Sequence, residues 1–212
     1  MTNTGSSTVN NGNVGSAPTA TVTGFPPGVV NGGILFTVAD PVTAQAHTDL
    51  QAAYTAAANA TGGVAGPGNL GGATLTPGVY TYATTAPWAG AGTILTLDGA
   101  GEYIFQIGTA ITTPANAVVS LINGASSDQV FWQLGTAATL GAANNFAGNI
   151  LAGSSITLGG GTLNGRALAL VEAVTISTAE IVNVPAAIPE PGTFMLLGFG
   201  LVSLAFGRRS TR

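Results

Sequence analysis

The feature that most constrains the fold is a recurrence of similar short segments in the second half of the chain. The segment 106–112 reads Gln-Ile-Gly-Thr-Ala-Ile-Thr, and 133–139 repeats it as Gln-Leu-Gly-Thr-Ala-Ala-Thr. Related segments follow at 153–158 and, after an equal interval, at 171–176. Short β-type runs every ~8–12 residues alone permit a sandwich, a barrel or a solenoid. Repeat steps of about 18–27 residues favour a parallel β-solenoid with one coil per repeat.

Two upstream segments, 85–88 and 15–19, fit the same frame, so the solenoid is expected to include the N-terminal part of the chain. Identical positions in successive coils then lie about 4.7–4.9 Å apart on one face. Unequal steps between coils are explained by insertions confined to loops.

One helix interrupts the β pattern. Asp40-Pro41 combines an N-cap carboxylate with a proline at the first helical position. The stretch that follows contains neither Gly nor Pro until Gly62-Gly63. These signals predict a helix over about 40–61. Its expected apolar face, which lies on a flat apolar surface, consists of Val42, Ala46, Leu50, Ala53, Tyr54 and Ala57.

The composition excludes several classes of function. Only 6% of the residues are charged, the net charge is −4, and the four basic residues are Arg166, Arg208, Arg209 and Arg212. Nucleic-acid binding needs clustered Lys and Arg, so it is not expected. The chain has no Cys, which rules out disulfides and thiolate metal sites. The many Gly, Thr, Ala and Asn residues suit tight turns and sheets of small side chains.

The C-terminal end has three parts in order. A Pro/Ala linker leads to Pro189-Glu190-Pro191, an apolar run follows from Phe194 to Phe206, and Arg208, Arg209 and Arg212 close the chain. Counted from Gly192 to Gly207, the run is marginal for a spanning helix, which needs about 17–25 residues. The alternative is a buried core helix, but the linker before the run and the arginines after it disfavour this.

This tail resembles the PEP-CTERM sorting signal of Gram-negative bacteria, from Pro189 to the end of the chain. The resemblance implies export, recognition by an exosortase-type membrane protease, and transient anchoring in the inner membrane by a short C-terminal apolar helix. The protein would then reach the cell surface or the medium. The start, Met1-Thr2-Asn3-Thr4-Gly5, has no signal peptide. We therefore expect the true N-terminus to lie upstream.

The repeats belong to a wider set of dispersed segments, which resemble the microbial ice-binding protein family over about residues 2–184. That family combines a discontinuous β-solenoid with a long helix and usually has a further strand before the position of Thr2. The resemblance implies a mainly β fold: a right-handed parallel β-solenoid with one long α-helix packed alongside. The matching segments are 23–28, 75–80, 104–108, 121–125, 130–135 and 163–169.

Family members bind ice through one flat solenoid face, often with a loose T-A/G-x-T/N pattern. Transferred to this sequence, the pattern predicts an ice-binding face, with Glu172 at its rim and Trp88 as a bulky departure from flatness. The predicted face residues are Ser16, Thr19, Thr85, Thr109, Thr112, Thr136, Thr139, Ser154, Thr157 and Thr175.

A physical reason supports this face. Thr presents a hydroxyl and a methyl group together, so a regular array can order water while exposing apolar area. The competing interpretation is that Thr is simply a good strand residue and that stacked Thr columns stabilise a solenoid without any ligand. Periodicity alone favours that structural interpretation, and the family resemblance favours ice.

Nothing in the sequence indicates catalysis, a metal site or a cofactor. His47 is the only His, and its neighbours Thr48 and Asp49 do not share its helix face, so a surface or packing role is expected. A polysaccharide-active β-helix would carry clustered acids or bases along a groove, whereas acids here are sparse and Arg166 is the only base within the solenoid.

These observations predict a non-enzymatic, monomeric protein with two parts. Residues 1–187 form an ice-binding solenoid domain that inhibits ice growth or recrystallisation, and 188–212 form the sorting tail. The alternative function is a structural or adhesive solenoid of the extracellular matrix without ice activity.

Overall fold

The computed structural model describes residues 1–19, 21–177 and 179–185. The predicted sorting tail and its apolar helix lie outside these residues. Within the described residues, no helix is long and apolar enough to cross a membrane. The described chain forms one α-helix, one 3₁₀ turn (η1, Ser127–Gln129) and short β-strands in three parallel sheets.

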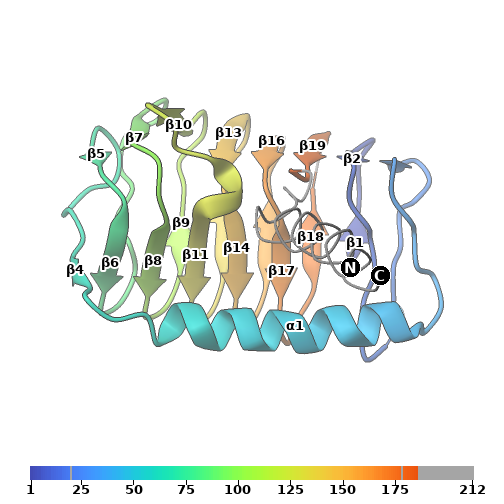
Figure 1. The fold of residues 1–212 in the computed structure, drawn as a ribbon. Helices are drawn as coiled ribbons and strands as arrows, with labels where there is room; N and C mark the ends of the chain where they lie inside the picture. The colour runs from blue at the N-terminus through green and yellow to red at the C-terminus, as the bar shows by residue number, and fades with distance from the viewer. Residues whose placement is uncertain (20, 178, 186–212) are drawn as a thin grey trace, which may run out of the picture.

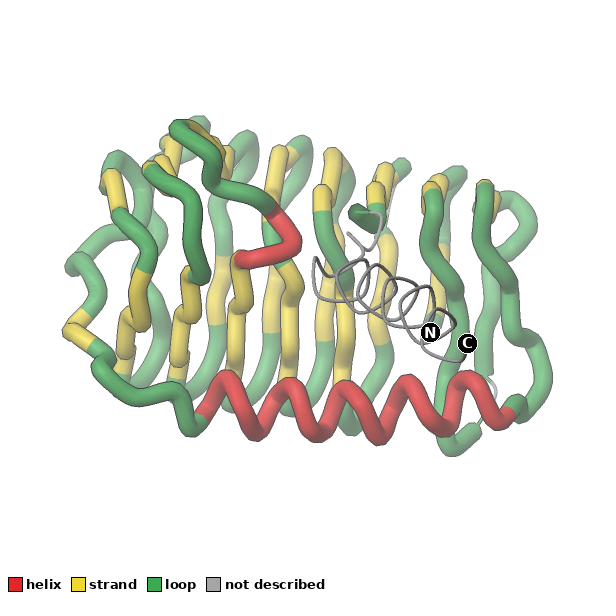
Figure 2. The backbone as a smooth tube through the Cα atoms, viewed as in Figure 1, coloured by secondary structure: helices red, strands yellow, loops and turns green. Residues whose placement is uncertain are grey.

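The three sheets form the sides of a stack of coils (Figures 1 and 2). The five-stranded sheet has the order β1-β18-β15-β12-β9, with β1 Thr2–Asn3, β18 Val174–Ile176, β15 Ile156–Leu158, β12 Ala138–Leu140 and β9 Ile111–Thr112. The eight-stranded sheet has the order β3-β2-β19-β16-β13-β10-β7-β5, with β3 Val29–Asn31, β2 Thr8–Asn10, β19 Glu180–Asn183, β16 Gly161–Asn164, β13 Asn144–Ala147, β10 Val118–Ile122, β7 Ile94–Asp98 and β5 Thr74–Leu75. The six-stranded sheet has the order β17-β14-β11-β8-β6-β4, with β17 Ala167–Ala169, β14 Asn149–Ala152, β11 Val130–Leu134, β8 Tyr103–Ile107, β6 Gly78–Tyr82 and β4 Val64–Ala65.

Each coil visits the six-stranded, the five-stranded and then the eight-stranded sheet. One coil runs through β14, β15 and β16, and the next through β17, β18 and β19. The predicted parallel β-solenoid is therefore confirmed. Its sequence order is discontinuous, because β1 pairs with β18 and β2 with β19, so the first coil stacks on the last.

The helix α1 (Pro41–Ala58) explains how the chain joins the two ends of the stack (Figure 1). It follows the coil of β3, runs along the stack, and delivers the chain to β4 at the opposite end. The predicted start is confirmed, since the Asp40 carboxylate accepts a hydrogen bond from the Val42 N–H at 2.8 Å. The helix ends at Ala58, slightly before the predicted boundary.

The helix packs on β8, β11 and β14 of the six-stranded sheet. Leu50 and Ala57 are buried there against Ile104 and Leu151, as predicted. Thr43 is buried as well, whereas Val42, Ala46 and Ala53 are exposed, so the buried stripe is rotated from the expected one. An alanine-rich helix buries little apolar area, and polar side chains add hydrogen bonds between the helix and the sheet. Gln106 Nε2 donates to Ala57 O, Tyr54 Oη to Leu134 O, and His47 Nε2 to Leu170 O.

Aromatic rings fill the widest part of the core. Phe105 and Trp132, from adjacent coils, stack with their centroids 4.0 Å apart, and Tyr80 extends the stack. Trp88 lies inside the stack as well, at 6% exposure, with its ring centroid 6.1 Å from that of Phe146. The expectation that Trp88 protrudes from the outer face is wrong. The indole N–H instead donates to Thr93 Oγ1, which allows the ring to be buried.

Candidate functional site

A column of threonines runs along the outside of the five-stranded sheet. The strand registers place Thr112 beside Thr139, Thr139 beside Thr157, and Thr157 beside Thr175. The column continues to Thr2, which pairs with Thr175, and then to Thr23. We call these residues the threonine ladder: Thr112, Thr139, Thr157, Thr175, Thr2 and Thr23. Neighbouring strands of a sheet are about 4.7–4.9 Å apart, so the ladder repeats at that spacing.

The alternation of each short strand explains why the ladder faces outward. In β15, Ile156 and Leu158 are both 0% exposed, and Thr157 between them must point to the opposite side. The same pattern holds in β12, where Ala138 and Leu140 are buried on either side of Thr139. The core therefore holds the strands by their alternate apolar residues and fixes the ladder from beneath.

The ladder residues are exposed or half-buried. Among the residues that the structure describes, none of the ladder hydroxyls makes a hydrogen bond to another protein group. The residues two positions before the ladder in three successive coils are Ala110, Ala137 and Ser155, which are small and neutral. The surface thus presents methyl and hydroxyl groups in a regular row, flanked by small side chains.

A second row lies at the corner between the six-stranded and five-stranded sheets. Backbone hydrogen bonds run from Thr136 N to Thr109 O, from Ser154 N to Thr136 O, and from Glu172 N to Ser154 O, at 2.7–3.0 Å. The first positions of the predicted motif therefore stack in one column, and the exposed Glu172 occupies the coil next to β1. A Gly precedes three of these positions because the coils approach closely: a Cβ on Gly135 would meet the carbonyl oxygen of Gly108.

The structure places the upstream residues of the predicted face differently. Ala86 pairs with Ile111, so Pro87, and not Trp88, lies beside Thr112, and Thr85 lies beside Ala110. Ser16 and Thr19 belong to a loop that precedes Thr23, and they line a cavity instead of standing in register with the ladder. The motif frame is therefore one residue off at 85–88, and it does not apply at 16–19.

Two members of the ladder, Thr2 and Thr23, are not among the residues predicted from the sequence. A signal for them exists in the sequence, because the pattern Val-Asn-x-Gly at 9–12 recurs at 30–33. The same displacement relates Thr2 to Thr23 and Asn10 to Asn31 in the structure. It differs from both displacements seen among the later repeats, so those spacings do not predict the first coils.

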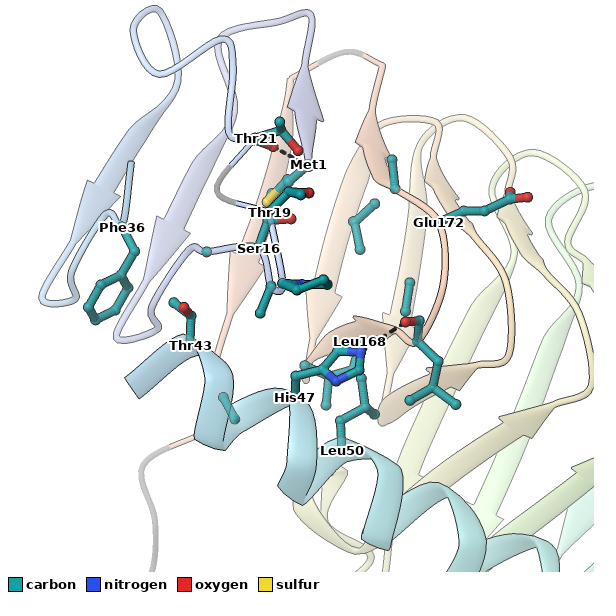
Figure 3. Close-up of a pocket in the computed structure, with 18 of the residues that line it drawn as sticks. Met1, Ser16, Thr19, Thr21, Phe36, Thr43, His47, Leu50, Leu168 and Glu172 are labelled. Atoms are coloured by element: carbon teal, nitrogen blue, oxygen red, sulfur yellow. Dashed lines mark hydrogen bonds between the residues drawn. The ribbon is translucent and has the colours of Figure 1, made fainter. Parts of the chain in front are cut away.

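A cavity of about 340 Å³ lies at the end of the stack where α1 begins (Figure 3). It is bounded by α1, the loop around Thr19 and the β17–β18 connection. Its single His is already engaged with Leu170 O, and Thr43 Oγ1 donates to Asp40 O. The lining residues thus contain no paired nucleophile and base. Across the described chain, no three His, Cys, Asp or Glu side chains gather where they could hold a metal.

Comparison with known families decides the relationship. A family model described as "Ice-binding-like" matches residues 1–182. The chain belongs to this family. A second model, described as a PEP-CTERM protein-sorting motif, matches residues 187–210. The resemblances noted for the solenoid and for the tail are both confirmed.

The chain is similar to ice-binding proteins of bacteria and fungi. The chain is 43% identical to an ice-binding protein of Nostoc sp. (strain HG1), and the match covers 99% of this chain and 81% of that one. Among solved structures, it resembles the ice-binding protein of the Antarctic ascomycete Antarctomyces psychrotrophicus, with a TM-score of 0.75, 34% identity, and 88% and 92% of the two chains covered. The Shewanella frigidimarina ice-binding protein 1 domain gives a TM-score of 0.73 at 26% identity, over 87% and 90% of the two chains.

Proposed function

We propose that the protein adsorbs to ice through the outer surface of its five-stranded sheet. The observation that carries the proposal is the threonine ladder: hydroxyls from successive coils, in register, with no protein partner among the described residues. Ice as the ligand is supported by membership of the ice-binding-like family and by the relatives, which are named ice-binding proteins.

The ladder supports adsorption by a simple physical route. Each hydroxyl can hold one ordered water, and each methyl group excludes water from the gap between neighbours. Both terms are modest, and they add because the core holds the threonines in place before contact with the crystal. Adsorbed molecules would then inhibit ice growth or recrystallisation without any catalytic step.

The face proposed here keeps most of the predicted residues. Thr112, Thr139, Thr157 and Thr175 form its central row together with Thr2 and Thr23. Thr109, Thr136 and Ser154 form the corner row, with Glu172 at its end. Ser16 and Thr19 are not part of it, and Thr85 lies in the flanking column beside Ala110, outside both rows.

Ice partitioning of matched variants tests the face. Thr139→Tyr and Thr112→Tyr insert a bulky ring into the ladder, whereas Thr162→Tyr makes the same change on the outer side of the eight-stranded sheet. During slow freezing, the parent and Thr162→Tyr should enter the ice, and the two ladder variants should enter at least tenfold less. Circular dichroism of each variant checks that it is folded. A folded parent that stays wholly in the liquid would contradict the function, and ladder variants that behave like the parent would contradict the face.

The sorting motif at 187–210 supports a location at the cell surface or beyond it. We propose that residues 188–212 form a separate tail that directs export through an exosortase-type protease and transiently anchors the chain in the inner membrane. The solenoid itself, residues 1–187, is proposed to be monomeric and to wind in the right-handed sense, as parallel crossovers nearly always do. A structural or adhesive role in the matrix is the alternative: it predicts glycan binding without any effect on ice.

A further inference from the structure

The tail leaves the solenoid at a defined corner. In the preceding coil, Gly165-Arg166 form the turn from the eight-stranded to the six-stranded sheet. The register of Asn164 with Asn183 places Val184-Pro185 at the same turn one coil later. The connection is fixed by Val184 N–H donating to Asn10 O at 3.1 Å and by Arg166 Nη2 donating to Pro185 O at 3.4 Å.

Arg166 also ties this corner to the coils behind it. Its Nη1 donates to Asn149 Oδ1 at 3.0 Å, and Asn149 Nδ2 donates to Asp128 O at 3.1 Å. Arg166, the only Arg or Lys of the solenoid, therefore holds in place the corner from which residues 186–212 continue. A load applied through the tail would be distributed over several coils.

This corner lies across the core from the threonine ladder. A coil with three sheets has three corners, and two of them border the five-stranded sheet: the turn at 170–173 and the turn that begins at Ser177. The exit at Pro185 is the third corner, between the other two sheets. Buried side chains such as Ile176 and Val182 lie between the exit and the ladder. Packed sheets are about 10 Å apart, so the separation is at least roughly that distance.

We infer that a chain tethered to a surface by its C-terminal tail holds the threonine ladder on the side that faces away from that surface. The tethered protein can then attach the surface to ice. This inference rests on the proposed function. Tethering through the N-terminal end would have a different effect. Met1 immediately precedes the ladder residue Thr2, so a surface attached there would cover the threonine ladder. The position of the exit therefore suits a surface-held ice-binding module as well as a released one.

Site-specific tethering tests the inference, because a chain without Cys accepts one unique attachment point. In the full chain, Ala187→Cys provides an anchor just beyond the exit, and Ser177→Cys provides one at the edge of the five-stranded sheet in the same coil. Ala52→Cys, on the exposed side of α1, provides a second anchor away from the ladder. Each variant is coupled to maleimide beads at equal density, and the beads are mixed with a growing ice front.

Beads coupled through Ala187→Cys or Ala52→Cys should be captured by ice at least tenfold more than beads coupled through Ser177→Cys. Equal capture from all three anchors, or better capture through Ser177→Cys, would overturn the inference while uncoupled variants still enter ice. If the uncoupled variants and the parent all stay in the liquid, the proposed function fails, and this inference fails with it.

Discussion

The five-stranded and eight-stranded sheets are built from the same coils, yet their outer surfaces treat polar groups in opposite ways. On the five-stranded sheet, the ladder hydroxyls have no protein partner among the described residues. On the eight-stranded sheet, asparagines from successive coils bond to one another through their side-chain amides, at 2.9–3.4 Å. The donors and acceptors follow the order Asn31, Asn10, Asn183, Asn164 and Asn145.

The difference shows how one scaffold separates stability from binding. An amide that bonds to the next coil stabilises the stack and has fewer groups left for water. A threonine column makes no such bonds and keeps its hydroxyls for an external lattice. The eight-stranded sheet is also less even, because the exposed Ile94, Ile181 and Val29 share one outward column with the smaller Thr162 and Thr8. We therefore assign ice to the five-stranded sheet.

The largest effects should come from cavities beneath the two surfaces. Ile156 and Leu163 belong to one coil, are both 0% exposed, and lie under the five-stranded and eight-stranded sheets, respectively. Ile156→Ala and Leu163→Ala should each lower the free energy of unfolding by about 2–5 kcal/mol, measured by urea denaturation. At a temperature where both variants are folded, only Ile156→Ala should reduce entry into ice, because it loosens the support of Thr157. Equal losses of ice entry would remove the distinction between the sheets.

Glu180, a buried titratable group in the eight-stranded sheet, should affect stability and leave ice entry unchanged. Glu180 in β19 is 2% exposed, and burial raises the pKa of its carboxyl group to about 7, although a hydrogen bond from the Gly160 backbone acts in the opposite direction. The folded state therefore favours the protonated form. The contribution of Glu180 to the free energy of unfolding is fully present below about pH 4.5 and is lost as the pH rises through about 7.

Glu180→Gln should remove this dependence and raise the free energy of unfolding at pH 8 by about 1–3 kcal/mol, with little change at pH 4. Denaturation curves at the two pH values measure the effect. Ice entry per folded molecule should stay constant over the same range, since threonine hydroxyls do not titrate there. A parent whose stability rises between pH 5 and pH 8 would show that Glu180 is ionised and compensated in the fold.

The sequence predicted the site best where the coils are equal in length. Thr139, Thr157 and Thr175 are evenly spaced along the chain, so a single step identifies their column. The prediction failed where loops change the number of residues per coil. The interval from Ala86 to Ile111 is shorter than the interval from Ile111 to Ala138, and an inserted loop lengthens the interval before Thr23. The asparagine row could not be predicted, because Asn is also a common turn residue, and only the register of the coils brings its amides together.

Interrupting the asparagine row should have a moderate effect on stability alone. Asn183 donates to Asn164 and accepts from Asn10, so Asn183→Ala removes two bonds from the middle of the row. We expect the free energy of unfolding to fall by about 1–2 kcal/mol. Asn145→Ala, at the end of the row, removes one of these bonds and should cost less. Ice entry should match the parent in both variants, and a clear loss in Asn183→Ala would show that the eight-stranded sheet also contacts ice.

The smallest effects should come from single-group changes within the ladder, and they separate its two chemical contributions. Thr157→Val replaces the hydroxyl with a methyl group, whereas Thr157→Ser keeps the hydroxyl and removes the methyl. Because the array adds many modest terms, each change should reduce ice entry less than about threefold, with no measurable loss of stability. Thr162→Val on the eight-stranded sheet is the matched control and should have no effect on ice. A larger loss from Val than from Ser would identify ordered water as the main contribution, and the reverse order would identify apolar contact. A tenfold loss from either variant would mean that adsorption depends on one residue and not on the summed contributions of the array.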